Sequence, residues 1–168
     1  MKKLIFISLI LITAFTISAC SKKEQVGGNV VNPMKEVESL EKLNEQVRGK
    51  LSKPAVMGVS NEKFFTITNG EKTIGDYQFE INGIKCDFRF ADRGSLEEDF
   101  SGYYINGKLA FPSNNIENGI EYNFEGDAKL ARWANTDGIY TFAYEDKEMD
   151  EDTFKNIVGE LITLTKPE

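Results

Sequence analysis

The strongest constraint on the fold is the stretch IGDYQFEINGIKCDFRFA, residues 74–91, which alternates apolar and polar side chains around Asn82-Gly83. An Asn-Gly pair between alternating runs is typical of a type I′ turn in a two-residue hairpin. The resulting register places apolar pairs on one face and opposite charges on the other. The predicted partners are Ile81 with Ile84, Phe79 with Cys86, Tyr77 with Phe88, Glu80 with Lys85, and Asp76 with Arg89.

The same period of two extends over residues 64–145, with turn residues between the runs. A second hairpin is predicted to turn at Asp137-Gly138, and the strand before it at Gly126-Asp127. A weaker hairpin signal lies at Asn106-Gly107 in YYINGKLAF. The predicted partners are Trp133 with Phe142, Ala131 with Tyr144, Tyr122 with Ala131, and Ile120 with Trp133.

A helix is predicted near the start of this domain, because Ser39 is a good N-cap and apolar residues then recur on one face. Gly49 is expected to end it in a left-handed conformation, with Leu51 packing back. An earlier start at Asn32-Pro33 stays open, since Val37 also matches the apolar stripe. The stripe consists of Leu40, Leu43 and Val47.

A second helix is predicted in MDEDTFKNIVGELITLT, with Asp150 as N-cap and Met149 with Phe154 as a hydrophobic staple. Its apolar stripe must cover a sheet face. We therefore predict an α+β fold: a single antiparallel, meander-like sheet packed on one face by an N-terminal and a C-terminal helix. The stripe consists of Phe154, Ile157, Val158 and Leu161.

The N-terminus predicts where the protein resides. Two lysines precede an uncharged run over residues 4–17, which is too short for a membrane span of about 20 residues and has the features of a secretory signal. Ile17-Ser18-Ala19-Cys20 resembles the lipobox of bacterial lipoproteins. That resemblance implies diacylglyceryl transfer to the Cys20 thiol, cleavage before it, and palmitate-like acylation of the new amine. A plain secretory signal that happens to end at a cysteine is the alternative.

The predicted organisation is a signal peptide over residues 1–19, a lipidated cysteine and flexible tether over 20–33, and one domain over 34–168. Cleavage removes two lysines and leaves 18 basic against 27 acidic side chains, a net charge of −9. Such an acidic chain is not expected to bind nucleic acid or anionic lipid by charge. We expect it at the extracytoplasmic membrane surface, held by its lipid.

Composition also narrows the chemistry. The chain has no histidine, which removes the commonest general base, the Ser-His and Cys-His arrangements, and imidazole zinc sites. Cys86 lies on the predicted inward face, where a thiol is a small hydrophobe with a raised pKa. The acidic run over residues 145–152 lacks the glycine and glutamate positions of an EF-hand loop and is better explained by helix capping and solvation. We expect no metal and no cofactor.

The longest candidate functional loop is ADRGSLEEDFSGYY, residues 91–104. Its Glu and Asp residues could serve as an acid/base pair of the kind that glycosidases use. Their spacing fits a solvated charge cluster equally well. The chain's many aromatics are expected in the core, unless exposed rings adjoin as a binding face. The candidate ligand or partner residues are Arg93, Glu97, Glu98, Asp99, Tyr103 and Tyr104.

Several short segments carry a family resemblance: SLEKLNEQVRGKL, residues 77–79, 89–91, 99–103 and 131–133, and the final FKNIV. Over residues 32–165 the chain resembles an uncharacterised domain of lipoproteins and anti-sigma-like membrane proteins of low-GC Gram-positive bacteria. The resemblance implies an extracytoplasmic α+β domain at a Gram-positive cell surface. We expect a non-catalytic domain that binds a peptide, an envelope protein or a small ligand. The alternatives are a carboxylate-based hydrolase of cell-wall carbohydrate, with Glu97, Glu98 and Asp99 as its candidates, and a sensory partner of a signalling membrane protein.

Overall fold

The computed structural model describes residues 33–69, 71–93, 99–111 and 119–167. Cys20, the signal peptide and most of the tether lie outside the described residues, as do Glu97 and Glu98.

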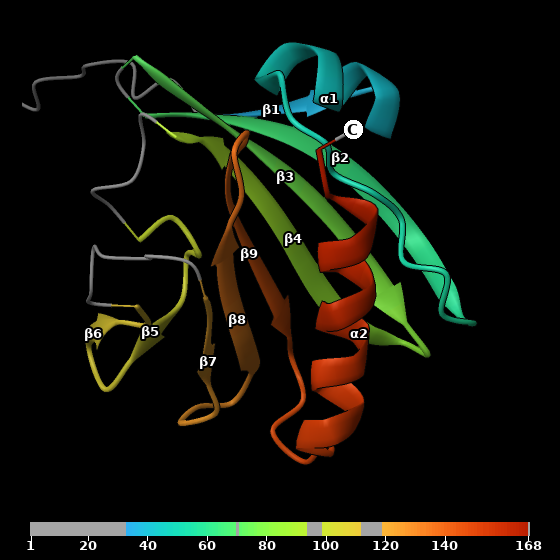
Figure 1. The fold of residues 1–168 in the computed structure, drawn as a ribbon, viewed down its shortest axis with the longest axis vertical. Coiled ribbons are helices and arrows are strands. Elements are labelled where there is room, and N and C mark those ends of the chain that lie inside the picture. Colours follow the sequence, from blue (N-terminus) through green and yellow to red (C-terminus); the bar gives the residue numbers. More distant parts are fainter. Residues whose placement is uncertain (1–32, 70, 94–98, 112–118, 168) are drawn as a thin grey trace, which may run out of the picture. The chain divides into compact units, whose positions relative to one another are not determined.

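The described residues form nine strands and two helices (Figure 1). They are, in chain order, β1 (Met34–Val37), α1 (Leu40–Val47), β2 (Val59–Asn69), β3 (Lys72–Ile81), β4 (Ile84–Asp92), β5 (Tyr104–Ile105), β6 (Lys108–Leu109), β7 (Ile120–Asn123), β8 (Lys129–Ala134), β9 (Gly138–Tyr144) and α2 (Glu151–Leu164).

Seven strands form an antiparallel sheet in the order β1-β2-β3-β4-β9-β8-β7. The class is therefore α+β, as predicted, but the sheet is not one continuous meander. Two meanders meet where β4 pairs with β9, with Phe88 opposite Phe142. The chain leaves the sheet between β4 and β7 and forms the separate two-stranded β5–β6 sheet, at the predicted Asn106-Gly107 turn.

The β3–β4 hairpin has the predicted register at all five residue pairs, with Asn82 and Gly83 both at positive φ. The predicted β7–β8 register is also confirmed, since Ile120 pairs with Trp133 and Tyr122 with Ala131.

The predicted β8–β9 register is wrong by two residues. Trp133 pairs with Tyr140, and Ala131 with Phe142. The turn lies one residue earlier than predicted, because Asn135 N donates to Gly138 O at 2.9 Å. The Asn135 side chain also accepts hydrogen bonds from the N–H groups of Asp137 and Gly138. Such an Asx turn ends the pairing at Ala134–Ile139.

Helix α1 begins at the predicted N-cap, where the Ser39 hydroxyl accepts a hydrogen bond from Lys42 N. It ends differently from the prediction, because the left-handed residue is Arg48, with φ 52°, and not Gly49. Gly49 instead lies against the Phe90 ring, with which an added Cβ would overlap. Val37, whose assignment was open, belongs to β1.

Helix α2 agrees with the prediction throughout. The Asp150 side chain accepts a hydrogen bond from Thr153 N, and Glu151 and Asp152 occupy the first turn. Met149 packs against the core cluster that contains Phe154. The predicted stripe of four apolar residues is buried.

One face of the sheet, which we call the helix face, carries the main hydrophobic core. Its side chains share one cluster with the buried side chains of both helices. Aromatic rings stack across the strands, as between Trp133 and Tyr140, whose centroids are 5.5 Å apart. Cys86 is buried among them, as predicted. Other core rings on this face belong to Tyr77, Phe79, Phe88, Phe90 and Phe142.

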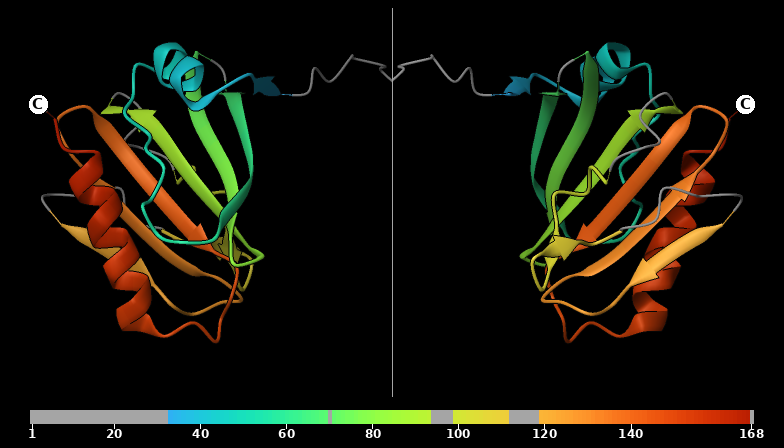
Figure 2. Two further views of the ribbon diagram at one scale, coloured as in Figure 1. Left: turned by 90° about the vertical axis from the view of Figure 1, so that its right-hand side faces the viewer. Right: turned by 90° about the vertical axis from the view of Figure 1, so that its left-hand side faces the viewer.

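The opposite face is covered by residues 99–111, which we call the strap, and we name this face the strap face. Phe100 packs with Ile139 and Ala91 of the sheet, and Phe111 with Leu130 and Ala143. Figure 2 shows α2 on one side of the sheet and the β5–β6 hairpin of the strap on the other. Part of the predicted functional loop is therefore a structural cover for a second, smaller core.

Candidate functional site

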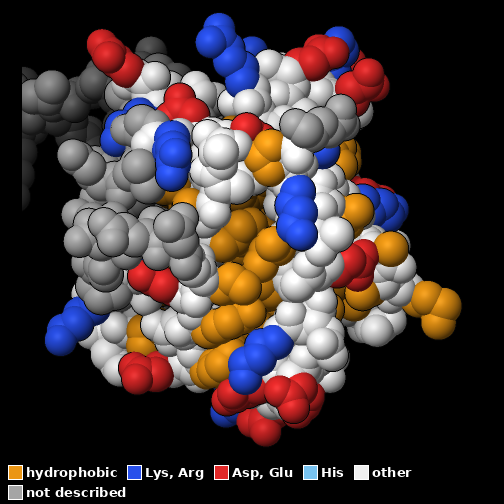
Figure 3. All heavy atoms as spheres, viewed as in Figure 1, with side chains coloured by type: hydrophobic (Ala, Val, Ile, Leu, Met, Phe, Trp, Pro, Cys, Tyr) orange, Lys and Arg blue, Asp and Glu red, His pale blue; other side chains and the backbone are white. Residues whose placement is uncertain are grey.

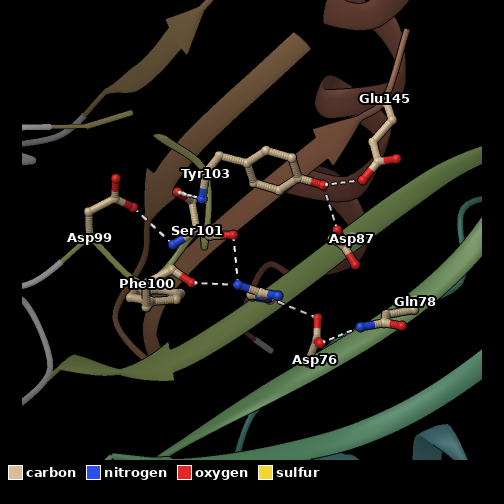
Figure 4. A network of polar contacts seen from close by, with 9 residues as sticks. Asp76, Gln78, Asp87, Asp99, Phe100, Ser101, Tyr103 and Glu145 are labelled. Carbon is tan, nitrogen blue, oxygen red and sulfur yellow. Dashed lines mark hydrogen bonds and ion pairs between the residues drawn. The ribbon is translucent and has the colours of Figure 1, made fainter. Parts of the chain in front are cut away.

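A buried ion pair lies between the sheet and the strap (Figure 4). Asp76 of β3 and Arg89 of β4 are cross-strand partners, with 3.0 Å between Oδ1 and Nε. The Asp76 side chain is fully buried, and its second oxygen accepts a hydrogen bond from Gln78 Nε2 at 2.8 Å. The sequence predicted the pairing of these charges, but not that the strap would bury them.

Burial and charge act against each other in this pair. Burial raises the pKa of Asp76, although the Arg89 guanidinium opposes the shift. Burial acts to lower the pKa of Arg89, but Asp76 outweighs it and the pKa is raised. Arginine stays protonated in proteins, so Arg89 is the fixed charge of this pair.

Arg89 also holds the strap in place. Its Nη1 donates hydrogen bonds to the carbonyl oxygens of Phe100 at 3.1 Å and Ser101 at 2.7 Å. Asp99 closes the strap on itself, because its two carboxylate oxygens accept from Ser101 N and Phe111 N, both at 2.9 Å. Asp99, a predicted ligand residue, therefore orders the backbone.

Next to this pair, two carboxylates converge on one phenol. The Tyr103 hydroxyl of the strap is 2.6 Å from Oδ2 of Asp87 and 3.1 Å from Oε1 of Glu145 (Figure 4). Burial, followed by the charge of Asp87, raises the pKa of Tyr103, so the phenol stays protonated. A phenol has one hydrogen to donate. The Tyr103 hydroxyl can therefore donate to only one of the two carboxylates at a time.

Tyr103 and Glu145 line a hollow of about 360 Å³ between the β5–β6 hairpin and the turn before β8, which we call the Tyr103 hollow. Tyr104 also lines it and is 68% exposed, so an aromatic ring stands at the surface there. Asp127 adds a second carboxylate. The other lining residues are Ile105, Gly126, Ala128 and Leu130.

Glu145 also lines a second, more polar hollow of about 610 Å³, in which Asp87 takes part. The Asp87–Tyr103–Glu145 cluster is thus shared between the two hollows. Beside the second hollow, Glu62 accepts a hydrogen bond from the Tyr77 hydroxyl at 2.7 Å. A bulge in β2 between Ser60 and Lys63 accompanies this arrangement.

The six predicted site residues divide into four groups. Tyr103 and Tyr104 come together at the Tyr103 hollow. Arg93 is exposed and does not line it. Asp99 is committed to the strap backbone, as described above, while Glu97 and Glu98 lie outside the described residues.

Three acids of this site, Asp87, Asp127 and Glu145, were not among the residues predicted from the sequence. Asp87 faces the strap because it alternates with Cys86 and Phe88 in β4, and this outward position was the signal available. Glu145 begins the acidic run that helix capping and solvation explain, and Asp127 belongs to the predicted Gly126-Asp127 turn. Their approach to Tyr103 depends on the path of the strap, which no local pattern predicts.

The acidic run over residues 145–152 and Cys86 were the other two candidates considered in the sequence. In the acidic run, Asp146 accepts from Glu148 N and Asp150 caps α2. Among the described residues, no group of three or more Cys, Asp or Glu side chains is placed to hold a metal ion. Burial raises the pKa of the Cys86 thiol to about 12, so this cysteine is a poor nucleophile.

No protein-family model, curated protein or solved structure matches the chain. Within the part of the chain that the structure describes, no helix combines the length and hydropathy needed to cross a membrane.

Proposed function

We propose that this protein is an extracytoplasmic lipoprotein, anchored through acyl chains on Cys20, whose domain binds a ligand without catalysis. The anchor is supported by the charged start, the short apolar run and the lipobox-like residues 17–20. Each buried CH₂ of such chains contributes about 0.8 kcal/mol, so two or more chains give stable attachment. The family resemblance to Gram-positive surface domains supports the same location.

We further propose that both helices cover the helix face of the sheet. A ligand of the opposite face would then contact the strap. The single cluster shared by α1, α2 and the sheet supports this arrangement. The strap then offers the Tyr103 hollow as the binding site.

The observation that carries the binding proposal is the Tyr103 hydroxyl between two carboxylates at the wall of an aromatic-lined hollow. One phenol hydrogen serves two acceptors, so a cationic donor completes the arrangement. The rings of Tyr103 and Tyr104 favour a cation as well. The ligand we propose is a positively charged group, either of a small molecule or of a basic side chain in a peptide or envelope protein.

The carboxylates of this site give the alternative of a carbohydrate hydrolase no additional support. Of its candidate acids, Glu97 and Glu98 lie outside the described residues, and both oxygens of Asp99 accept from backbone N–H groups. A pair of catalytic carboxylates needs the scissile oxygen or a water molecule between them. Asp87 and Glu145 converge instead on the Tyr103 hydroxyl, which occupies that space. Carbohydrate hydrolysis thus has no support from this pair of acids. A sensory role, with the hollow holding a membrane partner, fits the same site.

Binding is tested by titrating the full chain in lipid nanodiscs with benzyltrimethylammonium, followed by NMR shifts of tyrosine rings. Saturable shifts are expected, and Glu145→Gln should weaken binding by about tenfold. Glu36→Gln, at an exposed position in β1, is the matched control and should bind like the wild type. Equal affinity of the Glu145 variant and the wild type would refute the site.

The anchor is tested by growing cells with a radioactive fatty acid. The wild-type chain should take up label, and Cys20→Ser should not. Equal labelling of the two chains would remove the lipoprotein proposal while leaving the ligand site open to its own test.

A further inference from the structure

Lys129 is a cation in an unusual position. It is the first residue of β8 and lies on the helix face, because its cross-strand partner Tyr144 belongs to the main core. The residue is only 8% exposed, and its Nζ lies over the Phe124 ring, 5.2 Å from the centroid. Among the described residues no carboxylate lies within 4.0 Å of this ammonium.

Lys155 also contacts the Phe124 ring, but unlike Lys129 it is paired with carboxylates. Its ammonium, on α2, lies 5.6 Å from the ring centroid and pairs with Glu151 at 3.5 Å and Asp152 at 3.9 Å. A buried charge is costly unless it is paired, and a ring face compensates only in part. Lys129 is therefore the cation on the helix face that is best placed to receive an anion.

An incompletely covered apolar stripe runs away from Lys129 along the edge strand β7. Ile120 and Tyr122 point to the helix face, since their partners Trp133 and Ala131 are core residues. Ile120 is 42% exposed, whereas its partner Trp133 is 3% exposed. Figure 3 shows apolar side chains gathered in a hollowed stripe on the side viewed in Figure 1.

The stripe and the cation together define a ligand class. Tyr122 and Phe124 stack with centroids 5.7 Å apart, so the apolar surface continues from Ile120 to the Lys129 ammonium. Residues 120–124 of an extended strand span about 13 Å. An alkyl or arylalkyl chain of that length reaches from the exposed edge to the cation.

We propose that this stripe binds an apolar carboxylate, with its chain over Ile120 and Tyr122 and its carboxylate at the Lys129 ammonium. The site lies on the face opposite to the Tyr103 hollow and prefers the opposite charge. The inference is therefore independent of the proposed function. It gives Lys129 the counter-ion that the described part of the protein does not supply.

The chain carries its own reporter for this site. Trp133 is the only tryptophan in the sequence and is the cross-strand partner of Ile120. The full chain in lipid nanodiscs is titrated with 6-phenylhexanoate, and Trp133 fluorescence is recorded against nanodiscs without protein. The neutral alcohol 6-phenylhexanol measures the contribution of the carboxylate. A saturable change is expected for the carboxylate, with at least about tenfold weaker binding of the alcohol.

Variants separate the charge of Lys129 from its packing. Lys129→Met keeps most of the stem but should lose about tenfold in affinity for the carboxylate and nothing for the alcohol. Lys129→Arg should stay within about threefold of the wild type. Lys42→Met, on the exposed face of α1, is the matched control and should bind like the wild type.

Two further variants test the site even if Lys129→Met does not fold. Ile120→Gln changes a partly exposed edge residue and should weaken carboxylate and alcohol alike. Glu145→Gln should leave carboxylate binding unchanged, because it belongs to the other face. Equal binding of carboxylate and alcohol, unchanged affinity in both Lys129→Met and Ile120→Gln, or no saturable signal would overturn the proposal.

Discussion

Gly102 of the strap lies directly against the guanidinium of Arg89 in β4, and a Cβ added to Gly102 would overlap Nη1. The glycine also has a φ of +79°, in the region that side chains disfavour. The attachment of the strap to the sheet thus depends on the smallest residue at this point.

Substituting Gly102 should therefore be more harmful than substituting a glycine with the same backbone conformation alone. Gly107 has a φ of +75° and open space around it, so Gly107→Ala should cost about 1 kcal/mol. Gly102→Ala should cost clearly more, about 2–4 kcal/mol, because Arg89 must move from its strap carbonyls and Asp76. Urea unfolding followed by Trp133 fluorescence measures both. Equal losses would show that Arg89 does not fix the strap.

The buried pair predicts a particular pH dependence. Because burial raises the folded-state pKa of Asp76, its contribution to stability is complete below the unfolded pKa of about 3.9 and declines as pH rises through the folded value. The unfolding free energy of the wild type minus that of Asp76→Asn should therefore fall as pH rises above about 4. A difference that grows over this range would mean that the charge of Arg89 dominates burial.

Asp150 should behave in the opposite way. The hydrogen bond from Thr153 N lowers its pKa in the folded state, so its contribution is present above the unfolded pKa and is lost as pH falls through the folded one. Asparagine also caps helices, so Asp150→Asn removes the charge and keeps the cap. The advantage of the wild type over this variant, measured by urea unfolding, should shrink on acidification below about pH 4. An advantage independent of pH would show that the cap acts without its charge.

The two cysteines give a chemical prediction. Burial raises the pKa of the Cys86 thiol to about 12, so native protein should not react with a thiol reagent at neutral pH. When the protein purified from membranes is denatured, it should expose one reactive thiol per molecule, that of Cys86, because Cys20 carries lipid. Mass spectrometry locates the modified cysteine. Two thiols in denaturant would contradict lipidation, and fast labelling of native Cys86 would contradict its burial.

Parts of this fold could be predicted because local rules and burial agreed. The Asn82-Gly83 turn fixes a two-residue loop, and a one-residue slip would have moved Tyr77 and Phe79 to the strap face, so only one register was consistent. The register predicted for the β8–β9 hairpin was wrong, because Asp137-Gly138 gives the same turn signal as Asn82-Gly83 but does not form the turn alone. There Asn135 pairs with Gly138 and moves the turn one residue earlier, and its side chain also donates to Thr165 O at the end of α2. That tertiary contact was not visible in the sequence.

The candidate site was only partly predictable, for a related reason. Tyr103 and Tyr104 were found because they lie in a long loop between strands. Asp87 lies on the outward side of β4, and Glu145 follows directly after β9, so neither is marked as a site residue until Tyr103 of the strap reaches both. Asp99 looked like a ligand, but its carboxylate satisfies two backbone N–H groups of the strap. The sequence alone does not distinguish an acid that binds backbone N–H groups from an acid that faces a hollow.

The central claim, that the Tyr103 hollow binds a partner or ligand outside the cytoplasm, is tested most directly by photo-crosslinking in native membranes. A benzophenone amino acid replaces Tyr104, which lines the hollow, or in a matched chain Met57, which is 90% exposed and does not line it. Mass spectrometry should find a discrete adduct at position 104 that Glu145→Gln abolishes, and none at position 57. The absence of an adduct at 104, or the same adducts at both positions, would contradict the account.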